Sequence, residues 1–189
     1  MSIFDDMKES IENFLKELNT KYEKSKIWKV YKVGPTLTHC DICFKRNNKI
    51  YENGVEIPYL PEHVKCACSL MWLNSLSVGK ATNLGVNGAD YFLKYYGHLP
   101  NNYITKEEAK RLGWKSYKGN LNVVAPGKFI GGDIYKNQPA YLPEKEGRIW
   151  YECDIDYQGG YRNNSRLIYS NDGLIFKTDS HYLNFISIE

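Results

Sequence analysis

Apolar residues recur every three or four positions near the start of the chain, with lysine and glutamate between them. The recurring positions are Phe4, Met7, Ile11, Phe14, Leu15, Leu18 and Tyr22. This is the period of one face of an α-helix, so the pattern predicts an amphipathic helix. Such a helix covers a small core or pairs with a partner chain, and no chemistry is assigned to it.

The second half of the chain begins with helical patterns and ends with short strand-like segments. One helix-like stretch is ADYFLKYYG, and a second helix begins at Thr105, which forms a capping box with Glu108 and is followed by Gly113 as a terminator. The segments RIWYECDIDY, SRLIYS, LIFKT and YLNFISI read as strands. Asn171-Asp172-Gly173 predicts a hairpin turn between two of them. Helices followed by antiparallel strands predict an α+β domain.

A composition change between the two halves marks a domain boundary. The segment NSLSVGKATNLGVNG, from Asn74 to Gly88, is small, polar and glycine-containing, without a sustained period. We therefore expect two parts: residues 1–80, helical and rich in Cys and His, and residues 81–189, the α+β domain.

Composition and charge describe a folded protein without a strong electrostatic field. The chain has 189 residues, of which 42% are hydrophobic and 14% aromatic, and its net charge is +3. These values exclude a disordered chain. Nucleic-acid binding would require a few cations gathered in a cleft. The sequence shows neither a membrane-spanning run nor a signal peptide, so we expect a cytoplasmic product as synthesised, or release by a specialised or phage-derived route.

One set of polar residues has the composition that RNA cleavage requires. Strand alternation places Glu152 on one face with Arg148, Trp150 and Asp154, and His181 is expected at the start of the final strand. The associated cations are Lys106, Arg162 and Arg166. When the RNA 2'-hydroxyl attacks the adjacent phosphorus, a carboxylate can remove its proton, histidine can protonate the leaving oxygen, and cations can stabilise the phosphorane. This chemistry needs no metal cofactor. Each residue alone is more often structural, so the hypothesis depends on the set.

These residues lie in segments that resemble the barnase family of bacterial ribonucleases. The matching segments are YITKEEAKRLGW, KGNL, VAPGK, IGGDIY, GRIWYECDIDY, GYRNNSRLIYSNDGLIFKT and HY, in register from about residue 88 to residue 189. The resemblance implies helices packed on one face of an antiparallel sheet. It also implies cleavage of single-stranded RNA by transesterification through a 2',3'-cyclic phosphate.

The same resemblance implies a role for each matched residue. Glu152 matches the general base and His181 the general acid, while Lys106, Arg162 and Arg166 match the cations around the scissile phosphate. Asp133 and Arg148 match residues that are chiefly structural, and Tyr182 matches an aromatic residue beside the bound base. The chain departs from the family in the base-reading loop, where Lys136-Asn137-Gln138-Pro139 replaces a sequence with an Arg-Glu pair.

This departure changes the expected base preference. Guanine offers two adjacent donors that a carboxylate accepts well, whereas Pro139 offers only its main-chain carbonyl. We therefore expect a weaker preference for guanine. The candidate substrate-binding residues are Lys136, Asn137, Gln138 and Tyr182.

Four of the five cysteines gather in the first part of the chain, close to a histidine. Cys40, Cys43, His63, Cys66 and Cys68 offer five candidates for the four positions of a tetrahedral zinc site, and His39 is an outside candidate. Disulfides and free structural cysteines are the alternatives. Cys153 stands apart inside a strand and is expected in the core.

The segment that holds this cluster resembles a second family. VGPTLTHCDICFKRNNKIYENGVEIPYLPEHVKCAC, residues 33–68, is similar to the C-terminal part of phage Mu F-like minor head proteins. Together the two resemblances imply a bacterial toxin domain attached to a phage-derived adaptor, with RNA as substrate and a barstar-like immunity protein as partner. The alternative is a phage-head-like structural or interaction protein whose nuclease-like domain binds RNA without cleaving it.

Overall fold

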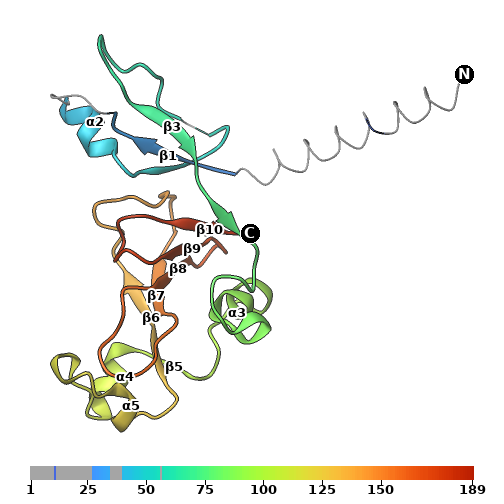
Figure 1. Ribbon diagram of the computed structural model, residues 1–189, viewed down its shortest axis with the longest axis vertical. Coiled ribbons are helices and arrows are strands. Elements are labelled where there is room, and N and C mark those ends of the chain that lie inside the picture. Colours follow the sequence, from blue (N-terminus) through green and yellow to red (C-terminus); the bar gives the residue numbers. More distant parts are fainter. Residues whose placement is uncertain (1–10, 12–26, 35–39, 56) are drawn as a thin grey trace, which may run out of the picture.

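The computed structural model describes residues 11, 27–34, 40–55 and 57–189. The amphipathic helix expected near the start of the chain lies outside the described residues except for Ile11, and so does His39. The described part has a mixed α+β architecture with two sheets. In Figure 1 a small three-stranded sheet lies at one end, α4 and α5 lie at the other, and a seven-stranded sheet lies between them.

The small sheet, here called the amino-terminal sheet, has the strand order β2-β1-β3 and is antiparallel. It consists of β1 (Trp28–Lys32), β2 (Ile50–Glu52) and β3 (Ser69–Trp72), with helix α2 (Asp41–Arg46) between β1 and β2. Residues 1–80 were expected to be helical and rich in Cys and His, and no strand was predicted there. The β1 sequence WKVYK nevertheless has a strand pattern, because Trp28, Val30 and Tyr31 are buried and the lysines are more exposed.

The large sheet has the order β4-β10-β9-β8-β7-β6-β5. Its strands are β4 (Ser75–Leu76), β5 (Tyr103–Ile104), β6 (Phe129–Tyr135), β7 (Trp150–Asp154), β8 (Arg166–Ser170), β9 (Ile175–Thr178) and β10 (Ile186–Ile188). The five central strands are antiparallel, whereas each edge strand pairs in parallel with its neighbour. The expected domain boundary after residue 80 stays a prediction, and β4, before it, already pairs with β10.

Two helices of the second half, near residues 89–96 and 106–111, lie where the sequence predicts, whereas the short third helix was not predicted. The helices are α3 (Ala89–Tyr96), α4 (Lys106–Arg111) and α5 (Leu121–Val124), with 3₁₀ turns at Gly85–Asn87 and Ser116–Lys118. Both hydrogen bonds of the capping box between Thr105 and Glu108 are present at the start of α4. Gly97 takes a left-handed conformation after α3, and Gly113 has φ +96° just beyond α4. Both turns are therefore suited to glycine.

Successive side chains of β7 point to opposite faces of the large sheet, and a separate hydrophobic cluster packs on each face. Cys153 packs against α3 through Ala89 and Leu93, so this thiol is a core residue as expected. Trp150 points to the opposite face and packs with Ile168 and Phe176. The amino-terminal sheet covers part of that second face, and Trp28 meets Phe176 edge-on at 5.4 Å between ring centroids. Glu152, the catalytic candidate on β7, points to the second face, beside the docked sheet.

Candidate active site and a cysteine and histidine cluster

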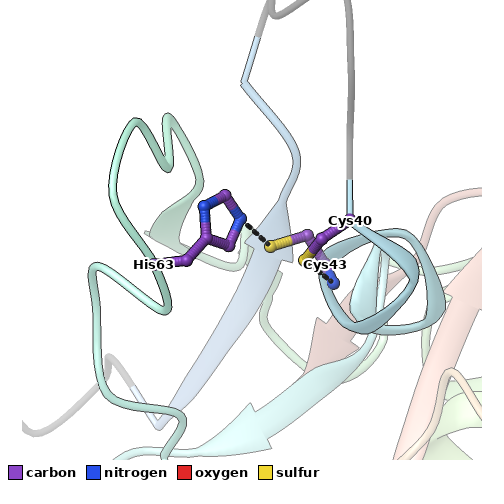
Figure 2. A group of neighbouring side chains, drawn as sticks. All are labelled: Cys40, Cys43 and His63. Carbon is purple, nitrogen blue, oxygen red and sulfur yellow. Dashed lines mark hydrogen bonds between the residues drawn. The ribbon is translucent and has the colours of Figure 1, made fainter.

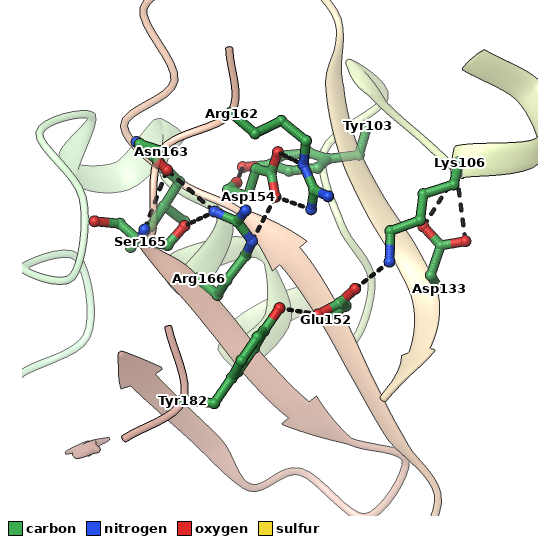
Figure 3. A network of polar contacts seen from close by, with 11 residues as sticks. Tyr103, Lys106, Asp133, Glu152, Asp154, Arg162, Asn163, Ser165, Arg166 and Tyr182 are labelled. Atoms are coloured by element: carbon green, nitrogen blue, oxygen red, sulfur yellow. Dashed lines mark hydrogen bonds and ion pairs between the residues drawn. The ribbon is translucent and has the colours of Figure 1, made fainter. Parts of the chain in front are cut away.

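Glu152 lies at the centre of a polar network on β7. Its carboxylate accepts hydrogen bonds from the Lys106 ammonium and the Tyr182 hydroxyl, as Figure 3 shows. Burial alone would raise the pKa of Glu152, because burial penalises the charged form. The two hydrogen bonds and the charges of Lys106 and Arg162 outweigh burial and hold this pKa below its ordinary value. The carboxylate is therefore ionised at neutral pH and able to accept a proton.

Lys106 is held at the first position of α4 by a carboxylate from the neighbouring strand. Asp133 on β6 accepts the backbone N–H of Lys106 at 3.0 and 3.3 Å, and it pairs in register with Glu152 across the two strands. An acceptor at this point complements the positive end of the helix. Asp133 therefore has the structural role expected of it, and it directs Lys106 toward Glu152.

Arg162 and Arg166 share one buried carboxylate. Asp154 is 1% exposed and accepts Arg162 Nε at 2.7 Å and Arg162 Nη2 at 2.6 Å. Arg166 Nε lies 2.9 Å from the same carboxylate, and its Nη1 donates to the Ser165 carbonyl at 2.7 Å. Both guanidinium groups therefore have fixed positions next to Glu152 (Figure 3). From the sequence, Asp154 was expected only as a neighbour of Glu152 on the strand face, and its i, i+2 spacing from Glu152 is the signal that could have indicated this role.

His181 lies in a loop between β9 and β10 and does not begin a strand. Its φ is +54°, and that of Tyr182 is +71°. The Thr178 hydroxyl accepts the Tyr182 N–H at 3.1 Å and the Ser180 hydroxyl accepts the Asn184 N–H at 2.9 Å, so side chains replace ladder hydrogen bonds here. The exposed imidazole lies 4.8 Å from the Tyr182 ring, centroid to centroid. Tyr182 thus connects His181 to Glu152.

The segment Lys136–Leu142, here called the base-reading loop after its match in the resemblance, begins beside the same tyrosine. Tyr135 stacks on Tyr182 at 5.1 Å with an interplanar angle of 28°. Asn137 is buried, and its side chain closes the loop: Nδ2 donates to the Leu142 carbonyl at 2.9 Å, and Oδ1 accepts the Leu142 N–H at 3.0 Å. The amide of Asn137 is therefore occupied within the protein. The exposed residues of the loop are Lys136, Gln138 and Pro139, and these three are called the loop tip below.

Arg148, the other residue expected to be structural, lies away from this network. Its Nε donates to Asp172 at 2.9 Å, its Nη2 donates to the same carboxylate at 2.8 Å, and its Nη1 donates to the Pro143 carbonyl at 2.7 Å. Asp172 belongs to the predicted hairpin turn, which connects β8 and β9. The hydrogen bonds from Arg148 lower the pKa of Asp172 to about 2. This pair therefore stabilises the hairpin.

A second group of polar side chains lies in the amino-terminal part of the chain. Cys40, Cys43 and His63 offer ligand atoms that all lie within 4.8 Å of one another, and so do Cys43, Cys66 and Cys68. Cys43 Sγ, common to both groups, lies 3.4 Å from His63 Nε2 and 4.0 Å from Cys66 Sγ. Figure 2 shows the first group, with His63 facing Cys43 from the opposite loop. All five cysteines of the chain are free thiols.

The surroundings of this cluster fit a soft metal ion. Two sulfur ligands about 2.3 Å from a tetrahedral zinc ion lie roughly 3.8 Å apart, close to the observed separation. His63 Nδ1 lies 2.9 Å from the Val64 carbonyl, which leaves Nε2 toward the sulfur atoms. The N–H of Cys43 donates to Cys40 Sγ at 3.4 Å, and this contact lowers the pKa of the Cys40 thiol. The donor set and its spacing therefore suit zinc.

The chain is similar to known bacterial ribonucleases over its second half. Residues 89–189 match the family model described as ribonuclease. A ribonuclease of Heyndrickxia coagulans is 54% identical over 100 residues, which cover 53% of this chain and 91% of that protein. Ribonucleases of Bacillus intermedius and Bacillus pumilus are also 54% identical over 100 residues, and the match covers 61% of each. The region matched by the family model contains the whole polar network and excludes the amino-terminal sheet.

No helix among the described residues is long and apolar enough to span a membrane.

Proposed function

This chain belongs to the ribonuclease family and is an endoribonuclease, and we propose that it cleaves single-stranded RNA through a 2',3'-cyclic phosphate, with Glu152 as general base and His181 as general acid. The observation that carries this proposal is the ionised Glu152 carboxylate, held between Lys106 and Tyr182 beside two anchored arginines.

In the first step Glu152 removes the proton of the ribose 2'-hydroxyl as that oxygen attacks phosphorus. His181 donates its proton to the departing 5'-oxygen, so the P–O5' bond breaks as the P–O2' bond forms. In the second step the two residues exchange roles: His181 takes a proton from water as the water oxygen attacks phosphorus, and Glu152 returns a proton to the 2'-oxygen as the P–O2' bond breaks. Positioned acids and bases each contribute about 10²- to 10⁴-fold to such reactions.

The cations stabilise the charge that develops on the phosphorane oxygens. Asp154 orients Arg162 and Arg166, and Lys106 extends from the start of α4, so three cations border the carboxylate. Because these groups are already in place, they need little reorganisation during the reaction. The net charge of the whole chain is only +3, so these three cations supply the positive charge that RNA binding needs at this place.

For base recognition we propose that the exposed tip of the base-reading loop contacts the nucleotide 5' to the cleaved bond, with Tyr182 beside the base. Lys136 and Gln138 supply polar groups at this tip, whereas Asn137 shapes the loop from inside. A carboxylate that could accept the two guanine donors is replaced by Pro139. Discrimination then depends on main-chain groups, and guanine preference is reduced.

The decisive test is cleavage of a fluorogenic RNA by the full-length wild type, Glu152→Gln and His181→Ala proteins. Each variant should lose at least about 100-fold in kcat, because a proton-transfer group is removed. RNA binding, measured separately by anisotropy with a 2'-deoxy analogue, should persist. Equal activity in wild type and either variant would refute the assigned roles.

We also propose that the cysteine and histidine cluster holds one structural zinc ion through four of the residues Cys40, Cys43, His63, Cys66 and Cys68. The observation that supports it is the convergence of two groups of donors on Cys43. A bound ion would tie α2 to the loop before β3, and small domains commonly gain stability in this way.

The biological setting completes the proposal. The resemblance of residues 33–68 to phage head proteins supports an adaptor attached to a nuclease toxin, and a producing cell would need a barstar-like immunity protein. Expression in a bacterial host is the test. In the absence of an inhibitor, the wild-type protein should stop growth of the host, and the Glu152→Gln protein should not.

A further inference from the structure

The base-reading loop rests on the amino-terminal sheet. Ile50 of β2 donates its backbone N–H to the carbonyl of Tyr141 at 2.7 Å. The Ile50 side chain is 4% exposed and belongs to the same buried cluster as Leu142, the last residue of the loop. One residue therefore bonds to the foot of the loop, residues 141–142, through its main chain, and its side chain is buried in the same cluster as Leu142.

A contact at the foot of the base-reading loop also affects the loop tip, because hydrogen bonds within the loop join its two ends. The two hydrogen bonds between Asn137 and Leu142 join its ends across the turn, so Leu142 and the exposed tip form one connected unit. At the other end, Tyr135 stacks on Tyr182 in the catalytic face. The loop thus has two supports, one within the nuclease and one in the amino-terminal sheet.

The second support, the amino-terminal sheet, packs closely against the nuclease. Trp28 of β1 is 6% exposed and lies in the cluster that contains Ile50, Trp150 and Phe176. Its edge-on contact with Phe176, and the contact of Trp150 with the same ring at 5.9 Å, connect the amino-terminal sheet to β7 and β9. The amino-terminal sheet is therefore held in place. If the Ile50 side chain were removed, the base-reading loop would move and the sheet would not.

We propose that Ile50 is a positioning residue for base recognition, so that the substrate preference of the nuclease is set partly by a sheet outside its family region. This inference rests on the proposed role of the base-reading loop. Ile50 acts through Tyr141 and Leu142 and does not touch RNA. Loss of its side chain lets the loop tip shift, and recognition by main-chain groups is sensitive to displacements of about 1 Å. Glu152 on β7 stays in place.

The test uses the full chain and four dinucleoside monophosphates that differ only in the 5' base. Ile50→Ala should raise KM about tenfold and change the ratios of kcat/KM among the bases, while kcat changes by less than about threefold. Ile50→Val should restore the wild-type ratios. Ile27→Ala, the matched control, removes the same atoms from an exposed position next to β1 and should behave as the wild type.

Two outcomes would overturn the inference, and they differ in what else they affect. If Gln138→Ala changes the base ratios but Ile50→Ala lowers only the melting temperature, Ile50 is a core residue and the loop remains the base reader. If neither variant changes the ratios, the loop does not read the base, and this inference fails together with that part of the proposed function.

Discussion

The hydroxyl of Tyr182 donates a hydrogen bond to the carboxylate of Glu152. Tyr182 also stacks on Tyr135 and lies next to His181, so one ring connects the proposed general base, the loop that carries the proposed general acid, and the base-reading loop. Burial, followed by the Glu152 contact, raises the pKa of the Tyr182 hydroxyl. It therefore remains a donor throughout the working pH range.

Removing that donor should shift the pH profile. In Tyr182→Phe the ring and its stacking remain, but Glu152 loses a hydrogen bond that favours its charged form, so the pKa of Glu152 rises. The base must be ionised, so the acidic limb of kcat/KM against pH should move to higher pH. Activity on the plateau should fall less than about tenfold. An acidic limb at the wild-type position would contradict the role of this hydrogen bond.

Lys106 should matter far more than its neighbours on α4. Lys106→Met removes a cation that contacts Glu152 and borders the proposed phosphate site, so kcat/KM should fall about 10²- to 10³-fold. Lys110→Met is the matched control, because Lys110 lies exposed in the last turn of the same helix and should leave activity within about twofold. Equal losses in the two variants would mean that only net charge matters.

The ion pair between Arg148 and Asp172 should contribute stability that depends on pH. The pKa of Asp172 is about 2 in the folded protein, against an ordinary value of 3.8. Its contribution is therefore present above about pH 4 and is lost as the pH falls toward 2. Asp172→Asn should lower the free energy of unfolding by about 1 kcal/mol at pH 7, because the carboxylate side chain is 32% exposed.

Denaturant unfolding of the two proteins at several pH values tests this expectation. The difference between wild type and Asp172→Asn should shrink to nearly zero at about pH 2. A difference that is the same at pH 7 and pH 2 would show that the substitution acts through the turn conformation and not through charge.

Zinc should be present in stoichiometric amount and should stabilise the amino-terminal part. Protein purified without chelator should contain one zinc per chain, and Cys43→Ser should lose it, because Cys43 belongs to both groups of ligand atoms. Cys153→Ser, in the core of the other half, is the control and should retain the metal. Metal content and melting temperature with and without chelator provide the measurements. If wild-type protein without zinc had the same melting temperature as the protein with zinc, a structural role for the ion would be ruled out.

Base preference should differ from that of the similar Bacillus ribonucleases. Side-by-side cleavage of dinucleotides should give this protein a smaller ratio of guanine to adenine cleavage, because Pro139 supplies no carboxylate. Pro139→Glu should increase that ratio if a side-chain acceptor is what the loop lacks. A ratio of guanine to adenine cleavage as high as the relatives give in the same assay would mean that main-chain groups of the loop suffice.

Local patterns in the sequence predicted the parts of the fold that depend on near neighbours. The capping box at Thr105, the hairpin turn around Asp172 and the shared strand face of Glu152 and Asp154 follow from spacings of two to three residues. Their prediction is possible because the hydrogen bonds and side-chain directions involved are set within one turn or one strand.

Contacts between distant segments were beyond such patterns. The docking of Trp28 on Phe176 and the hydrogen bond from Ile50 to Tyr141 join residues about 150 and 90 positions apart in the chain, and no periodicity encodes them. The direction of the Asn137 side chain also could not be predicted, although its partner is only five residues away. An amide in a predicted binding loop can face either the ligand or the backbone of its own loop. Here it faces the backbone.

The parallel pairing of Ser75–Leu76 with Ser187–Ile188 has a practical consequence for anyone who wishes to produce the nuclease alone. A shortened protein starting at residue 81 would lack the strand that covers β10 and would expose a row of unpaired N–H and C=O groups. Bare edges of this kind recruit strands from other molecules. Such a fragment should self-associate as its concentration rises, and restoring residues 74–80 should reduce this association because β4 again pairs with β10.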